Sequence, residues 1–100
     1  MTKNEAREIL TGAAYAEWAE DLDHARRLKS FVLADDAQNR LRETLYGIED
    51  WLDAVFDQGR SPEDADHQFL GSSDRARGLG YRAPSRVLAR EAEWALREGA

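Results

Sequence analysis

Apolar side chains recur at helical spacing through most of the chain, most clearly between Asp36 and Gly59. The apolar positions there, at steps of three or four, are Ala37, Leu41, Leu45, Ile48, Leu52 and Val55. This spacing places all six on one side of a helix with 3.6 residues per turn. We therefore predict an amphipathic central helix that begins with a carboxylate cap at Asp35 or Asp36 and ends at Gly59.

The segment before this helix has two mainly apolar stripes at helical spacing, out of phase by about a quarter turn. The first is Ala6, Ile9, Leu10 and Ala13, and the second is Trp18, Leu22, Ala25, Lys29 and Val32. Thr2 and Glu5 have capping-box spacing, so we expect a helix to begin near residue 3. Because Thr11-Gly12 separates the stripes, we expect either one kinked helix from 3 to 33 or a short helix followed by a long one. The short link at Ala34–Asp36 predicts an antiparallel hairpin with the central helix.

The last forty residues predict two further helices. Ser61 and Pro62 indicate a helix start, because Ser caps a helix and Pro suits its first position. Gly71 ends this short helix, and residues 72–83 predict a loop that includes up to one helical turn. A final helix is expected over residues 84–98, with a core face of Leu88, Ala92 and Ala95 flanked by Val87, Trp94 and Leu96.

No run of residues alternates apolar and polar side chains with β-branched enrichment, so no strand is expected. The predicted fold class is all-α: a small helical bundle of three main helices plus one or two short helices. We expect a single helical domain that spans residues 1–100. The predicted core consists of Leu22, Ala25, Leu41, Leu45, Ile48, Leu52, Val55, Leu88 and Ala92.

Composition narrows the classes of function. The absence of Cys excludes disulfides, thiolate zinc sites and Cys nucleophiles, and it fits a cytoplasmic protein. The first residues lack the apolar stretch of a secretory signal, and no apolar run is long enough to span a membrane. The net charge is −6, with −8 over residues 1–70 and +2 over residues 71–100. An acidic body disfavours direct binding of nucleic acid and favours a protein partner with a Lys/Arg-rich surface.

The polar side of the central helix carries five carboxylates and a tyrosine, which we call the acidic face. Its residues are Glu43, Tyr46, Glu49, Asp50, Asp53 and Asp57. Like charges three or four residues apart destabilise a helix, and no Lys or Arg lies between Arg42 and Arg60 to relieve them. This face is interpreted either as a solvated surface or as a docking surface with an aromatic anchor for a basic partner. Trp51 is expected at the rim of the apolar stripe, where it would be available to an interface.

Two histidines suggest, but do not establish, a metal site. The pairs Glu20/His24 and Glu63/His67 each share a helix face, so together they have the chemistry to chelate a divalent ion. Their spacing is one residue longer than the Glu-x-x-His spacing of di-metal bundles, and acids are abundant enough for coincidence. We predict no catalytic residues, no cofactor and no metal, although a metal-dependent enzyme remains an alternative.

The C-terminal third carries a basic segment, composed of Arg75, Arg77, Arg82, Arg86 and Arg90 with Tyr81 among them. Its glycines, Gly78 and Gly80, have neither P-loop nor dinucleotide spacing. These arginines are expected to neutralise the acidic helices or to meet the acidic face of a second subunit, so a homodimer is compatible with the sequence. The alternative is a DNA-binding regulator or antitoxin-like protein that uses residues 72–97.

Together these features favour a non-enzymatic interaction protein. A small, acidic, helical chain that displays Glu43, Tyr46, Asp50, Asp53 and Asp57 on one helix resembles, in general character, phage-encoded antagonists of bacterial defence, including anti-CRISPR proteins. The resemblance implies an inhibitor, in the host cytoplasm, that binds basic residues of a nucleoprotein or CRISPR surveillance complex and blocks nucleic-acid binding. Our hypothesis is that Glu49, Asp50, Asp53 and Asp57 meet that basic surface.

Overall fold

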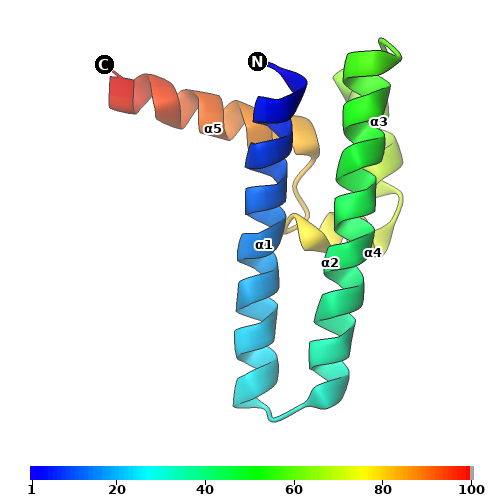
Figure 1. Ribbon diagram of the computed structural model, residues 1–100, viewed down its shortest axis with the longest axis vertical. Coiled ribbons are helices and arrows are strands. Elements are labelled where there is room, and N and C mark those ends of the chain that lie inside the picture. The colour runs from blue at the N-terminus through cyan, green and yellow to red at the C-terminus, as the bar shows by residue number, and fades with distance from the viewer. Residues whose placement is uncertain (100) are drawn as a thin grey trace.

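The computed structural model describes the backbone of residues 1–99 and the side chains of residues 1–91, and it consists of helices joined by short loops (Figure 1). The elements are α1 (Lys3–Arg27), α2 (Phe31–Leu52), a π-helical turn η1 (Asp53–Asp57), α3 (Pro62–Leu70), α4 (Ser73–Gly78) and α5 (Pro84–Gly99). No strand occurs among these residues, and three long helices accompany two short ones, which confirms the predicted fold class. None of the helices in the described part of the chain combines the length and apolarity needed to cross a membrane.

Local capping signals account for several helix boundaries. Thr2 and Glu5 form the predicted capping box at the start of α1, with the Glu5 amide donating to the Thr2 hydroxyl at 3.1 Å. Ser61 caps α3 through the Asp64 amide, and Pro62 occupies the first turn as expected. Gly59 follows η1 with a φ of +69°, a left-handed conformation that favours glycine. These boundaries agree with the sequence because each depends on neighbouring residues only.

The boundary between the first two long helices differs from the prediction. α1 runs unbroken through Gly12 and ends at Arg27, and α2 begins at Phe31 instead of near Asp36. Ser30 caps α2 by accepting a hydrogen bond from the Leu33 amide at 3.1 Å. Lys29 takes a left-handed φ of 52° and reverses the chain, although it is not a glycine. The predicted link at Ala34–Asp36 is therefore wrong and lies inside α2.

The antiparallel hairpin of α1 and α2 is confirmed, and it forms the frame of the fold (Figure 1). α3 and α4 pack beside α2 in the half of the hairpin that lies away from its turn, and α5 crosses near the start of α1. The shared core contains Ala6, Leu10 and Ala14 of α1, Ile48 and Leu52 of α2, Phe69 of α3 and Leu79. The half of the hairpin nearest the turn therefore projects from the body as a two-helix arm.

The predicted core is confirmed in part. Ala25, Ile48 and Leu52 are buried, and the remaining described positions, Leu22, Leu41, Leu45, Val55 and Leu88, are partly buried. Val87, expected at the flank of the last helix, is buried and belongs to the core. The predicted positions Ala92, Trp94, Ala95 and Leu96 lie outside the residues whose side chains are described.

A second side of α2, outside the predicted apolar face, is also buried. Thr44, Gly47 and Trp51 face α3 and α4, and Trp51 is only 4% exposed, so its predicted place at a rim is wrong. Small residues make this contact possible. A Cβ at Gly47 would lie 2.9 Å from the Phe69 ring, and one at Gly78 would overlap the Thr44 side chain.

Asp66 connects three of the helices. Its carboxylate accepts a hydrogen bond from Nε1 of Trp51 at 2.8 Å, and it also accepts the amide of Ser85 at 3.2 Å and the Ser85 hydroxyl. Trp51 belongs to α2, Asp66 to α3, and Ser85 to the first turn of α5. One carboxylate thus satisfies a buried indole and an amide at a helix start, which fixes α5 against the body.

Candidate protein-binding face on the central helix

The acidic face forms a continuous exposed stripe along α2 and η1. Its members follow one another at steps of three and four from Glu43 through Tyr46, Asp50 and Asp53 to Asp57, and all are exposed, as is Glu49 beside them. Tyr46 is 59% exposed and has carboxylates on either side along the helix. A half-exposed aromatic ring among charged groups is typical of an anchor for a partner.

Two cations from the first turns of α1 pair with this face. Nζ of Lys3 lies 2.8 Å from Oδ1 of Asp53 and 2.6 Å from Oδ2 of Asp57. Arg7 donates to both oxygens of Glu49, at 2.7 Å from Nε and 3.2 Å from Nη2. Along the chain no base is near these carboxylates, so they were expected to be uncompensated. That view is wrong, since the hairpin brings Lys3 and Arg7 to them.

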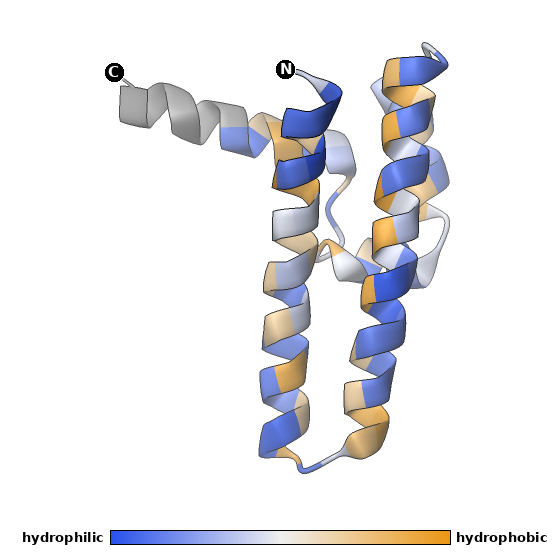
Figure 2. Cartoon of the chain, in the orientation of Figure 1, coloured by the Kyte–Doolittle hydropathy of each residue, from blue (hydrophilic) through white to orange (hydrophobic). Residues whose placement is uncertain are grey.

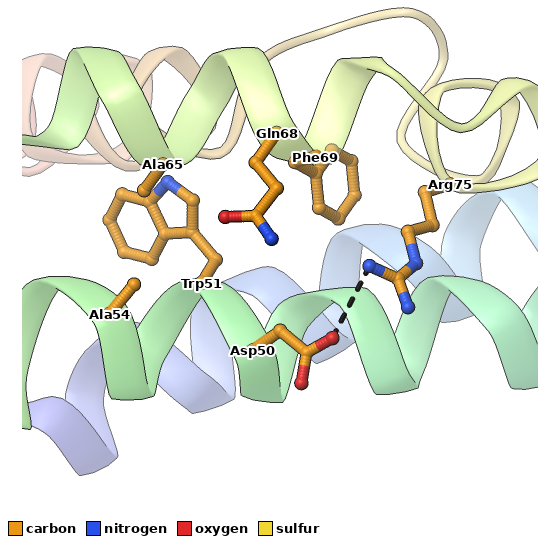
Figure 3. Close-up of a pocket in the computed structure, with 7 residues that line it drawn as sticks. All are labelled: Asp50, Trp51, Ala54, Ala65, Gln68, Phe69 and Arg75. Atoms are coloured by element: carbon orange, nitrogen blue, oxygen red, sulfur yellow. Dashed lines mark ion pairs between the residues drawn. The ribbon is translucent and has the colours of Figure 1, made fainter.

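A third cation reaches the face from α4. Nη1 of Arg75 lies 3.3 Å from Oδ2 of Asp50, and the pair is visible in Figure 3. Between α4 and α5, Nη2 of Arg82 lies 3.8 Å from Oε1 of Glu17 in α1. The expectation that the basic segment neutralises acidic helices within the fold is therefore confirmed for Arg75 and Arg82. Arg77, Arg86 and Arg90 are exposed.

The ion pairs shift the pKa values of the groups that form them. Hydrogen bonds from Lys3 hold the pKa of the Asp53 carboxyl below its ordinary value, and the same contacts raise the pKa of Lys3. The hydrogen bond to Glu49 likewise raises the pKa of Arg7. Both shifts favour the charged form of the group, as expected for a salt bridge. With five carboxylates and three cations, the acidic face has a net charge of −2 instead of −5.

The end of the acidic face lies on the π-helical turn η1. The amide of Gln58 donates to the carbonyl of Asp53 at 2.9 Å, which is the i to i+5 pattern of a π-helix. Asp53 and Asp57, at the two ends of η1, both contact the same Lys3 ammonium. π-helical turns are frequent at functional sites, and no feature of the sequence indicated this one.

A shallow hollow borders the acidic face between α2, α3 and α4. Its lining residues, drawn in Figure 3, are Asp50, Trp51, Ala54, Ala65, Gln68, Phe69 and Arg75. It encloses about 200 Å³ with open solvent included. Pockets for small molecules usually hold about 300 to 1,000 Å³, so this hollow does not have the size of a substrate site.

The two histidines are not brought together. His24 lies near the end of α1, at the hairpin turn, whereas His67 lies on α3 beside the opposite half of α2 (Figure 1). Within the described residues, no group of three or more His, Cys, Asp and Glu side chains is arranged to hold a metal ion. The Glu20/His24 and Glu63/His67 pairs therefore do not combine into the four-ligand site that the sequence suggested.

The sequence did not reveal Lys3 and Arg7 as partners of the acidic face, nor Asp66 as a connecting residue. The signal for Lys3 and Arg7 was their four-residue spacing, which places them on one side of α1. Comparisons of the chain with protein-family models, with curated proteins and with solved structures found no match.

Proposed function

We propose that this protein is a non-enzymatic interaction module that uses the acidic face to bind a basic, DNA-binding surface of a host nucleoprotein. The proposed partner is a defence complex such as a CRISPR surveillance complex. Binding of the protein blocks the access of this complex to nucleic acid. The observation that supports the proposal most is the exposed Tyr46 among carboxylates that are themselves exposed. Carboxylates along one helix offer a basic groove the same charge as a row of phosphates.

The intramolecular ion pairs leave this face able to bind cations. Asp50, Asp53 and Asp57 each use one carboxylate oxygen in their ion pair, and no second intramolecular bond to the other oxygen occurs among the described side chains. Ion pairs this exposed contribute little to folding, because water and salt compete for both partners. A Lys or Arg of a partner therefore adds to the face, or replaces Lys3 on it, at small cost.

The end of the face near Glu43 and Tyr46 differs from the end near Asp53. Glu43 has no ion pair among the described residues, whereas Lys3 already holds Asp53 and Asp57. Tyr46 lies one helical turn from Glu43 and one from Asp50, so an aromatic contact and two charged contacts are available together. We place the centre of the interface at Tyr46 for this reason.

Affinity capture followed by DNA competition tests the proposal. Tagged protein is used to capture partners from host lysate, and a captured complex is then titrated with labelled DNA in the presence of the protein. We expect capture of a DNA-binding complex, and release of its DNA as the protein is added. Capture should be lost with Glu43→Gln and Tyr46→Ala combined, and retained with Glu8→Gln and Glu20→Gln, which remove exposed acids of α1.

Direct binding of DNA by the protein itself would overturn the proposal in favour of the DNA-binding regulator. Arg77, Arg86 and Arg90 are exposed and are the residues that such a protein would use. A titration with duplex DNA at low salt separates the two functions, because phosphate contacts are strongest there. The interaction module is expected to give no binding in this titration.

A further inference from the structure

The turn of the α1/α2 hairpin carries a cluster of exposed apolar side chains, which we call the hairpin tip. Its residues are Leu28, Phe31, Val32 and Leu33. Phe31 is 89% exposed and Val32 is 70% exposed, and no other large apolar side chain described is as exposed as Phe31. Figure 2 shows this hydrophobic start of α2 beside the hydrophilic end of α1.

Exposed apolar residues are unexpected at the start of α2. The first turn of an exposed helix is where carboxylates stabilise the helix dipole, yet the first turn of α2 has none. The first turn of α2 holds Phe31, Val32 and Leu33 instead of carboxylates. An aromatic side chain has an area of roughly 150–250 Å², of which Phe31 exposes most; with the smaller shares of Leu28, Val32 and Leu33, the tip exposes on the order of 400 Å² of apolar surface. The largest apolar patch on a typical monomer has about this size and is often functional.

The charges around the tip are divided between the two helices. The α1 side carries Arg26, followed by Lys29 in the turn. Neither has an ion pair among the described side chains, while Arg27 is paired with Asp23. The α2 side carries Asp35 and Asp36, which are exposed and likewise unpaired among those residues. The tip is therefore apolar in the middle, basic on one side and acidic on the other.

We propose that the hairpin tip binds a second copy of this chain and forms a symmetric dimer. A twofold axis perpendicular to the plane of the hairpin places the α1 side of one tip against the α2 side of its partner. Arg26 and Lys29 then face Asp35 and Asp36 of the other copy, and the same contacts recur on the other side of the axis. Phe31 and Val32 of both copies meet between these two sets of charges.

Area and charge both favour a second copy over other occupants. Two tips in full contact bury about 800 Å² of apolar surface, and their charged rims bring the buried total near 1,000 Å². An interface of this size is weak, so we expect a dissociation constant of about 10 µM or weaker. An anionic membrane is a poor occupant, because the chain has a net charge of −6 and Asp35 and Asp36 adjoin the tip. Dimerisation through the arm leaves both acidic faces open, so the dimer is bivalent for a repetitive basic partner.

Sedimentation velocity over about 10 µM to 1 mM protein tests the dimer. We expect the weight-average mass to rise from monomer to dimer over this range, and the rise to be lost with Phe31→Ser. Tyr46→Ser removes an exposed aromatic ring from the acidic face of the same helix and should leave the rise unchanged. Circular dichroism of each variant checks that the helices persist. A monomer at every concentration, or a dimer that survives Phe31→Ser, overturns the proposal.

A charge-exchange experiment tests the orientation of the two copies. One variant carries Asp35→Lys and Asp36→Lys, and the other carries Arg26→Glu and Lys29→Glu. Each variant alone is expected to stay monomeric at about 1 mM, because like charges then face each other. Their equimolar mixture is expected to dimerise, because opposite charges face each other again on both sides of the axis. A mixture that stays monomeric, or a monomeric wild-type chain that binds phosphatidylserine vesicles through Phe31, refutes the second copy as the occupant.

Discussion

Replacing Asp66 tests whether one carboxylate fixes α5 to the body. The Asp66→Ala variant removes the acceptor of the Trp51 indole, which is buried and would be left without a hydrogen bond. It also removes the acceptor of the Ser85 amide and hydroxyl in the first turn of α5. The first loss is at the contact between α2 and α3, and the second is at the contact between α3 and α5. We expect both to lower the free energy of unfolding.

The magnitude follows from these contacts. Leaving a buried donor without its partner costs about 1–3 kcal/mol, and loss of a side-chain acceptor at a helix start costs about 0.5–2 kcal/mol. We expect Asp66→Ala to lower the free energy of unfolding by about 2–4 kcal/mol, against a total near 5–15 kcal/mol for a domain of this size. Asp66→Asn keeps an amide oxygen at the position of Oδ1, so it should cost only about 1 kcal/mol.

Urea denaturation, followed by far-UV circular dichroism, measures these differences. His67→Ala serves as the matched control, because His67 is exposed on the same helix and makes no hydrogen bond among the described side chains. Surface substitutions of this kind change stability by no more than about 0.5 kcal/mol. An Asp66→Ala variant as stable as His67→Ala would refute the view that Asp66 holds the three helices together.

Three further outcomes follow from particular contacts. Gly78→Ala should lower the free energy of unfolding by about 1–3 kcal/mol, because its Cβ would overlap Thr44. Gly12→Ala should raise the free energy of unfolding by about 0.5–1 kcal/mol, because its Cβ would meet open space. Urea denaturation measures both changes. Burial raises the pKa of Glu17, so its ionised form disfavours folding, and Glu17→Gln should gain stability over the wild type as the pH rises from 4 to 7 in thermal melts. The lowered pKa of Asp53 contributes stability that is present above pH 3.8 and lost as the pH falls through its folded value; Lys3→Gln should return that pKa toward 3.8 in an NMR titration.

Local signals predicted most of the fold, but the hairpin turn was misplaced for a physical reason. The second apolar stripe continued through Ala25, Lys29 and Val32, so the periodicity showed no break where α1 ends. The chain reverses at Lys29, a residue that rarely adopts the left-handed conformation, and no glycine marked the site. Asp35 and Asp36 are good capping residues, so the helix start was predicted there. The residue that caps the helix is Ser30.

The misplaced turn also explains why the ion pairs of the acidic face were missed. In an antiparallel hairpin, residues equally distant from the turn lie opposite each other. A turn at Lys29 places Arg7 opposite Trp51 and Lys3 opposite Val55, so both cations fall within reach of the acidic face. A turn near Asp35 would have placed them against α3. The burial of Trp51 required a different kind of information, because it depends on α3 and α4 packing against a second side of α2.

The origin of the three cations bears on how the acidic face binds a partner. Lys3, Arg7 and Arg75 come from α1 and α4, so the face loses negative charge only when the helices assemble. Substitution of one of these cations restores part of that negative charge. Lys3→Gln leaves Asp53 and Asp57 without their intramolecular cation and changes the net charge of the face from −2 to −3. If the face docks on a basic surface, this variant should be captured more strongly than the wild type at low salt, with the difference fading as salt is added. If the acidic face is only solvated and contacts no partner, both proteins should be captured equally at every salt concentration.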